Sequence, residues 1–280
     1  GKPEAFTYVD FAALAGDRIE VTLSSSMDVR VDPGETRWGQ QTGLFFEPPR
    51  EAMSRWVDWV AMTHGSRTAQ GGASGWLSTT DGNPGETLLE VVEAVRASGG
   101  KLRPEAILIE NAYQNTEANP MEPTGYFPRG LPFYARKIAG IKAAPGLFQD
   151  YDGNQQSRSD IHQIIQGEIG MGFNFFKIIY RLTASNLPVR GKLTYFQRFR
   201  LAFQELRKSA GEDTRLLSVM SLRKRAVLGS VDSSRVAGNV FRTSIRERIS
   251  SCLWAMPLGN RWFAVDNDSF YLATEVEGVS

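Results

Sequence analysis

The chain has 280 residues, 41% of them hydrophobic and 11% aromatic, which is the composition of a folded protein with a sizeable core. Its 32 basic and 31 acidic residues nearly cancel, and its single cysteine excludes an intramolecular disulfide framework. With two histidines a histidine-rich zinc site is excluded, and we expect neither a metal nor a cofactor. No apolar run reaches the ~18 residues of a membrane span, and the first residues do not form a signal peptide. We therefore expect a location in the cytoplasm or in a virion.

The N-terminal region is predicted to be rich in β-structure. Polar and apolar side chains alternate over Arg18–Leu23 and again over Asp28–Val31, as in half-buried strands. Asp32-Pro33-Gly34 then favours a turn, and a further strand is expected over 42–46. We interpret residues 17–46 as a small antiparallel sheet or a β-rich arm.

The middle of the chain alternates between helix and strand. Helices are predicted to begin at Pro48-Pro49 and at Asn83-Pro84, and the apolar run Ala106–Ile109 is typical of a buried strand. Four prolines lie between residues 111 and 133, which predicts an irregular crossing. We place a boundary there, between a mixed α/β region over 1–130 and a second region over 131–280.

From Ser159 the periodicity predicts helix over roughly a hundred residues. The apolar run Phe173–Leu182 is interpreted as a buried helix, Leu193–Lys208 as an amphipathic helix, and Thr214–Leu228 as a further helix. The last helix is expected to begin at Asp232 or Ser233, before a β-hairpin over 261–265 and 270–274. The predicted fold class is α+β, with a mainly helical C-terminal half, a β-rich N-terminal region and a C-terminal β-hairpin.

Positive charge is concentrated in residues 177–248, where 16 Lys or Arg stand against five acids. Arginine forks match phosphate oxygens, so this pattern favours a nucleic-acid-binding surface. The residues predicted to bind nucleic acid are Arg198, Arg200, Arg207, Lys208, Arg223, Lys224, Arg225, Arg235, Arg242 and Arg246. The alternative is that the basic stretch pairs with the acidic N-terminal part of the chain, within one molecule or between subunits.

A basic helical surface and β-rich ends together favour a self-assembling structural protein of the viral coat or nucleocapsid kind. The expected partners are nucleic acid, with RNA favoured, and other copies of the chain, but no membrane. A non-assembling component of a larger nucleoprotein complex is one alternative. No run of residues is specific enough to assign the chain to a known family.

An enzyme is the other alternative, although the main interpretation is that the chain is not one. The candidate catalytic groups are the carboxylate pairs Asp150/Asp152 and Asp266/Asp268, and Ser74 in a glycine-rich loop. None of them lies in a complete catalytic motif.

Overall fold

The protein is described by a computed structural model. It covers residues 7–14, 18–25, 33–34, 47–67, 76–79, 83–110, 114–115, 119–152, 158–181, 195–219, 226–236, 245–259 and 261–266. All structural statements below refer to these residues.

A seven-stranded sheet organises the molecule. Its strands run in the order β3-β4-β7-β8-β9-β10-β11, and each pairs with its neighbours in parallel. The strands are β3 (Trp76–Thr79), β4 (Ala106–Ile109), β7 (Ala144–Asp152), β8 (Phe175–Arg181), β9 (Arg215–Ser218), β10 (Ser233–Arg235) and β11 (Ala264–Asp266). Because the spatial order follows the chain order and helices separate most of the strands, the sheet is a curled half-barrel of the (β/α) type.

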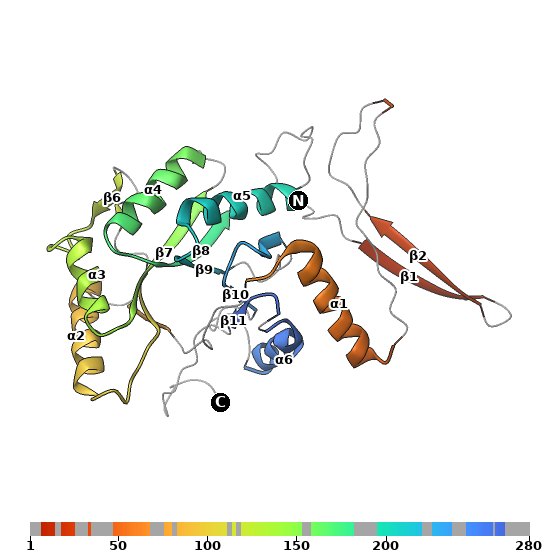
Figure 1. Cartoon of the computed structure of the whole chain (residues 1–280), viewed down its shortest axis with the longest axis horizontal. Coiled ribbons are helices and arrows are strands. Elements are labelled where there is room, and N and C mark those ends of the chain that lie inside the picture. The colour runs from red at the N-terminus through yellow and green to blue at the C-terminus, as the bar shows by residue number, and fades with distance from the viewer. Residues whose placement is uncertain are drawn as a thin grey trace.

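Helices surround the strands (Figure 1). They are α1 (Pro49–His64), α2 (Pro84–Ala97), α3 (Leu131–Ala139), α4 (Arg158–Gly170), α5 (Tyr195–Ala210) and α6 (Ile245–Ala255), followed by the short 3-10 helix η3 (Met256–Leu258). The predicted starts of the helices at Pro49 and Pro84 are confirmed. Proline is tolerated there because the first N–H groups of a helix have no intrahelical partner.

Two small hairpins lie outside the main sheet. The antiparallel strands β1 (Thr7–Leu14) and β2 (Arg18–Ser25) form one, at the edge of the molecule in Figure 1. The second pairs β5 (Gln114–Asn115) with β6 (Asn119–Pro123). The strand predicted over Arg18–Leu23 is confirmed as part of β2, whereas 28–31 and 42–46 lie outside the described residues.

Alternation along the strands divides the sheet into two faces. The outer face packs against the helices and contributes residues such as Ile107, Phe176 and Ile178 to the large core. The inner face holds a smaller cluster that includes Leu108, Phe148, Phe175 and Leu217. A parallel sheet covered on both faces needs apolar side chains at successive positions, which explains the continuous apolar runs in β4 and β8.

Gly146 makes room for this inner packing. A Cβ added to Gly146 would lie 2.8 Å from Cδ1 of Phe175 and 3.1 Å from Cδ1 of Leu108. Any side chain at position 146 would therefore displace the Phe175 ring. The glycine lets an aromatic ring cover two strands at the floor of the inner face.

The predicted fold class is wrong, because the C-terminal half is not mainly helical and the sheet runs through it. Residues 173–182 were interpreted as a buried helix because they are apolar on every side, but they contain β8. A central parallel strand is buried on both faces, so its sequence lacks the alternation of a half-exposed strand.

Three further C-terminal predictions are corrected. The helix predicted from Thr214 is replaced at its start by β9, and the one predicted from Asp232 is replaced by β10. The first strand of the predicted hairpin overlaps β11, which pairs in parallel with β10. Its second strand, 270–274, lies outside the described residues. The division at residue 130 stays a prediction, and the sheet takes strands from both sides of it.

Candidate functional site

Polar side chains gather where the parallel strands end. In open and closed α/β folds ligands bind beyond the carboxyl ends of the strands, so this edge is the first place to look for a site. The ladder register places Phe148 beside Lys177 and Asp150 beside Ile179, with Glu110 one step past the end of β4. All of these positions belong to the inner face, because they continue the alternation of Leu108, Phe148 and Phe175.

Lys177 and Glu110 form the deeper ion pair of the edge. Lys177 Nζ lies 2.6 Å from Glu110 Oε1, and both side chains are largely buried. The ammonium also lies 5.6 Å from the centroid of the Phe148 ring, so it crosses β7 to reach the carboxylate. Residues of three neighbouring strands are thereby joined in one row.

Asp150 and Arg181 form a second ion pair nearer the mouth. Arg181 Nε donates to Asp150 Oδ1 at 2.7 Å, and Arg181 Nη2 donates to Oδ2 of the same carboxylate. Arg181 is 61% exposed, whereas Asp150 is half-buried. A bidentate fork fixes the plane of the carboxylate while leaving the pair open to solvent.

The far side of the same edge carries Arg235 and Asp266. The two residues stand opposite each other in the ladder of β10 and β11, on the face that holds Leu217 and Val219. Arg235 is buried and Asp266 is half-buried. The edge therefore carries opposite charges at both ends of the sheet.

The spacing of Glu110 and Asp150 suits chemistry that needs two carboxylates. Neighbouring strands are about 4.8 Å apart and each strand residue adds about 3.3 Å, so these positions, one strand and two residues apart, have Cα atoms about 8 Å apart. Glycosidases use carboxyl pairs separated by about 5 to 9.5 Å. Side chains of ordinary length at Glu110 and Asp150 can meet that requirement.

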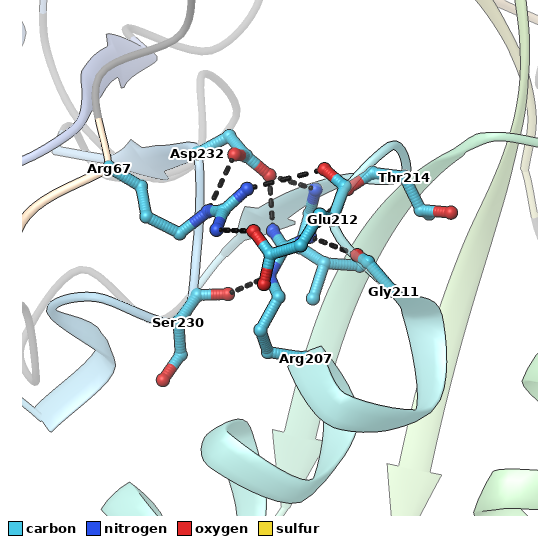
Figure 2. A network of polar contacts seen from close by, with 8 residues as sticks. Arg67, Arg207, Gly211, Glu212, Thr214, Ser230 and Asp232 are labelled. Carbon is cyan, nitrogen blue, oxygen red and sulfur yellow. Dashed lines mark hydrogen bonds and ion pairs between the residues drawn. The ribbon is translucent and has the colours of Figure 1, made fainter.

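The opposite, amino edge of the sheet holds a different network (Figure 2). Arg207, at the end of α5, donates Nε to the Ser230 carbonyl at 2.9 Å and Nη1 to the carbonyls of Gly211 and Thr214, and its Nη2 contacts Asp232. Burial lowers the pKa of Arg207, and the charge of Asp232 opposes this effect.

Asp232 is shared by several donors at this amino edge. Its Oδ2 accepts the Leu216 amide at 2.8 Å in addition to Arg207, while its Oδ1 accepts Arg67 Nε at 3.0 Å. Arg67 also contacts Glu212, whose pKa is lowered by the hydrogen bond from Arg67 and by its charge. The network joins α5, β9, β10 and the segment after α1, as expected of a structural clamp.

The residues predicted to bind nucleic acid do not form one surface. Arg207 is part of the buried clamp and Arg235 is buried at the carboxyl edge, whereas Lys208 and Arg246 are exposed on α5 and α6. Arg198 and Arg200 are half-buried on α5. The remaining four, Arg223, Lys224, Arg225 and Arg242, lie outside the described residues.

Several cations of the basic stretch instead pair with acids that precede it. Lys177 contacts Glu110, Arg181 contacts Asp150, and Arg215 Nη1 lies 3.2 Å from Glu105 Oε2. The pairs with Glu105 and Glu110 match the alternative in which the basic stretch meets the acidic N-terminal part of the same chain. Charge that is segregated along the sequence is interleaved in the folded sheet.

The sequence pointed to part of the carboxyl edge. Asp150 and Asp266 come from the two carboxylate pairs considered for an enzyme. Ser74 and Asp268 lie outside the described residues, and so does the side chain of Asp152. Glu110 was missed, although an acid directly after the buried run 106–109 is a usable signal. Lys177 and Arg181 were counted only as charge.

Two further searches were confined to the described ranges. There, no group of three or more His, Cys, Asp or Glu residues is arranged to hold a metal ion. No helix among the same residues is long and apolar enough to cross a membrane.

Comparison with solved structures shows the fold. The α-galactosidase of Thermus thermophilus, in complex with p-nitrophenyl α-D-galactopyranoside, matches with a TM-score of 0.61 and 17% identity over 95% of this chain and 60% of that chain. The α-galactosidase of Saccharomyces cerevisiae with raffinose gives 0.52 and 12% over 75% of this chain and 53% of that one. A cycloalternan-degrading enzyme of Trueperella pyogenes, in complex with cycloalternan, matches with a TM-score of 0.50 and 12% identity, over 76% of this chain and 40% of that chain.

No protein-family model and no curated protein sequence matches the chain. The chain spans 60% of the length of the T. thermophilus enzyme and 53% of the yeast enzyme.

These similarities overturn the functional prediction. The prediction of a viral coat or nucleocapsid protein is wrong, because the fold is a (β/α) half-barrel that matches solved glycoside-degrading enzymes. The expectation that the chain is not an enzyme is contradicted by the same finding, and the enzyme alternative fits better. RNA and further copies of the chain as partners stay predictions.

Proposed function

We propose that the chain is the barrel of a carbohydrate-active enzyme that binds a saccharide at the carboxyl edge and cleaves a glycosidic bond. The observation that carries the proposal is the barrel shared with the T. thermophilus α-galactosidase over 95% of this chain, with two carboxylates at the edge where barrels bind ligands. Because the two sequences are 17% identical, this similarity supports the fold, and we propose the substrate class from the groups at the carboxyl edge.

The edge offers the groups that a saccharide needs. Sugar hydroxyls both donate and accept hydrogen bonds, so carboxylates and cations side by side can bind them in pairs. Glu110 and Lys177 offer this combination at depth, and Asp150 and Arg181 offer it at the mouth. A sugar hydroxyl can accept a hydrogen bond from the cation of a pair while a neighbouring hydroxyl donates one to the carboxylate, so the ion pairs need not be broken.

In the proposed reaction Glu110 and Asp150 flank the scissile bond. One of the two carboxyl groups delivers a proton to the leaving oxygen, and the other stabilises the positive charge that develops on the sugar or activates a water molecule. Their Cα spacing of about 8 Å lets the carboxyl groups reach either the closer separation of retaining enzymes or the wider one of inverting enzymes.

A second candidate function is saccharide binding without cleavage. It is favoured by the finding that Glu110 and Asp150 each contact a cation. Paired carboxylates and cations can hold the hydroxyls of a sugar through hydrogen bonds without any chemical step. The same edge would then recognise a sugar and leave its bonds intact.

The test combines binding with turnover. The purified chain is titrated with raffinose in a calorimeter and incubated with p-nitrophenyl α- and β-glycosides, with nitrophenol release as the readout. We expect release that falls by about 100-fold or more in Glu110→Gln and in Asp150→Asn. Binding without release would support the second candidate, and neither binding nor release would refute both.

Glu105→Gln is the matched control. Glu105 and Glu110 lie at opposite ends of β4, and both pair with a cation of the basic stretch. Only Glu110 lies at the carboxyl edge. We expect Glu105→Gln to bind and turn over as the unaltered chain does, and an equal loss in both variants would contradict a site at that edge.

A further inference from the structure

The outer face of β7 holds a buried amide where its neighbour β8 is apolar. Gln149 pairs in the ladder with Ile178, whereas Tyr151 pairs with Tyr180. Gln149 and Tyr151 are both buried, and they flank Asp150 on either side. The amide of Gln149 thus enters the layer between strand and helix directly beside a candidate catalytic carboxylate.

These side chains meet a buried acid. Gln149 Nε2 donates to Oε1 of Glu168 on α4, and both residues are only 1% exposed. Tyr151 is equally buried, and its hydroxyl has no hydrogen-bond partner among the described residues. Burial and the charge of Glu168 raise the pKa of Tyr151 well above the usual value. A carboxyl group, an amide and a phenol therefore share a space that water does not reach.

A buried polar pair is a costly way to stabilise a fold. Moving a carboxyl group out of water is costly, and a buried polar pair can often be replaced by apolar residues of similar shape without loss of stability. A directional hydrogen bond does provide what apolar contacts lack, namely one defined position of a strand against a helix. Local departures from packing rules are expected where function requires them.

Asp150 needs such a support. Arg181 fixes the plane of the carboxylate from the solvent side, but it is 61% exposed, and an exposed ion pair contributes little to stability. The position from which the Asp150 side chain starts is set by the backbone of β7. That backbone is anchored on the outer side through the two residues next to Asp150 in the chain.

We propose that Glu168 is a positioning residue, which through Gln149 holds the carboxyl end of β7 so that Asp150 points at the bound saccharide. The inference rests on the proposed function, in which Asp150 contacts the ligand. Glu168 itself touches no substrate, because it lies on α4 behind the strand.

The test replaces the polar pair by an apolar one. We expect Gln149→Leu/Glu168→Leu to melt at or above the temperature of the unaltered chain, yet to bind raffinose about tenfold more weakly, as is usual when the support of a binding group is removed. A merely structural pair would lower both quantities together or neither. Unchanged raffinose affinity in the folded double variant would overturn the proposal.

Two further variants make the result specific. The exchange Gln149→Glu/Glu168→Gln keeps one carboxyl group and one amide, so we expect affinity within about threefold of the unaltered chain. Ser209→Ala removes the contact of His162 Nδ1 with Ser209 Oγ, 2.8 Å long, on the side of α4 that faces α5, and should leave affinity unchanged. If the leucine pair does not fold, the exchange variant decides, and a folded exchange variant with tenfold weaker binding overturns the proposal.

Failure of the proposed function is recognised separately. If the unaltered chain binds no saccharide, the positioning role is read from amide hydrogen exchange. We then expect faster exchange at Asp150 and Tyr151 in the leucine pair, with the amides of 107–109 in β4 unchanged. Equal exchange in both proteins would overturn the positioning role as well.

Discussion

The two edges of the parallel sheet use the same kinds of side chain in opposite ways. At the amino edge Asp232 accepts from Arg67, Arg207 and a backbone amide, and Arg207 reaches three carbonyl groups besides. At the carboxyl edge Glu110 and Asp150 each contact one cation.

The difference is one of remaining capacity for hydrogen bonds. A carboxylate has about four lone-pair sites, so those at the carboxyl edge can still accept from a ligand, whereas the amino-edge groups are occupied by the chain itself. The charged groups of the amino edge thus bind one another and the backbone, whereas Glu110 and Asp150 at the carboxyl edge keep free acceptor sites for a ligand. Four experiments can break or sharpen this comparison.

The largest expected effect is at the amino edge. Asp232→Ala removes the partner of Arg207 and leaves a buried guanidinium without its counter-charge, so we expect a loss of about 3–5 kcal/mol in the free energy of unfolding, measured with urea. Lys208→Ala, at the exposed neighbouring position of α5, should change it by less than about 0.5 kcal/mol. A loss below about 1 kcal/mol in Asp232→Ala would show that the network is not a clamp.

The buried ion pair of the carboxyl edge should give a smaller effect that a second change repairs. Lys177→Met leaves Glu110 largely buried beside an apolar side chain, and we expect a loss of about 3 kcal/mol in the free energy of unfolding. Adding Glu110→Gln should restore at least half of it, because the remaining amide carries no charge. Additive losses in the double variant would mean that the two side chains do not depend on each other.

The exposed ion pair should separate binding from stability. Arg181→Gln is expected to change the free energy of unfolding by less than about 1 kcal/mol, because exposed pairs are screened by water. Saccharide affinity, measured by calorimetry, should nevertheless fall, since a ligand hydroxyl loses a donor. Equal affinity in both proteins would remove Arg181 from the proposed site.

The smallest effect is a pH dependence at the amino edge. Arg67 lowers the pKa of Glu212 below its usual 4.5, so the folded state binds the proton less readily than the unfolded chain. The contribution of this contact to stability is then present above the unfolded pKa and is lost as the pH falls through the folded one. Denaturation between pH 6 and 3 should be less pH-dependent in Glu212→Gln; an identical dependence would show that the exposed contact contributes nothing.

Much of the local structure was predictable, but the sheet was not. The helices at Pro49 and Pro84 carry prolines and apolar spacings that act locally, and the run 106–109 is apolar and short, as expected of a strand. The strands β9 and β10 have only four and three residues, too few for periodicity to register. β8 pairs with β9 and with β7, which was not predicted either, so the apolar run of β8 was assigned to a helix.

The site was predictable only in fragments, because the sequence shows charge and not pairing. Sixteen cations in one stretch suggested one surface, but the strands point Lys177 and Arg235 inward while α5 buries Arg207 at the opposite edge. Asp150 stood out as an acid in a loop-like segment, whereas its place at the end of a strand followed from the ladder. Registers between distant strands are non-local, and no local pattern encodes them.

Gly146 has a consequence for how sequences of this kind diverge. Its hydrogen is the only substituent that the Phe175 ring permits, whatever the edge above it binds. Selection for folding alone would therefore keep glycine at position 146 but allow other residues at position 150. Selection for saccharide recognition would keep both Gly146 and Asp150. An invariant glycine at 146 would therefore indicate a packing requirement, and an invariant aspartate at 150 would indicate saccharide binding.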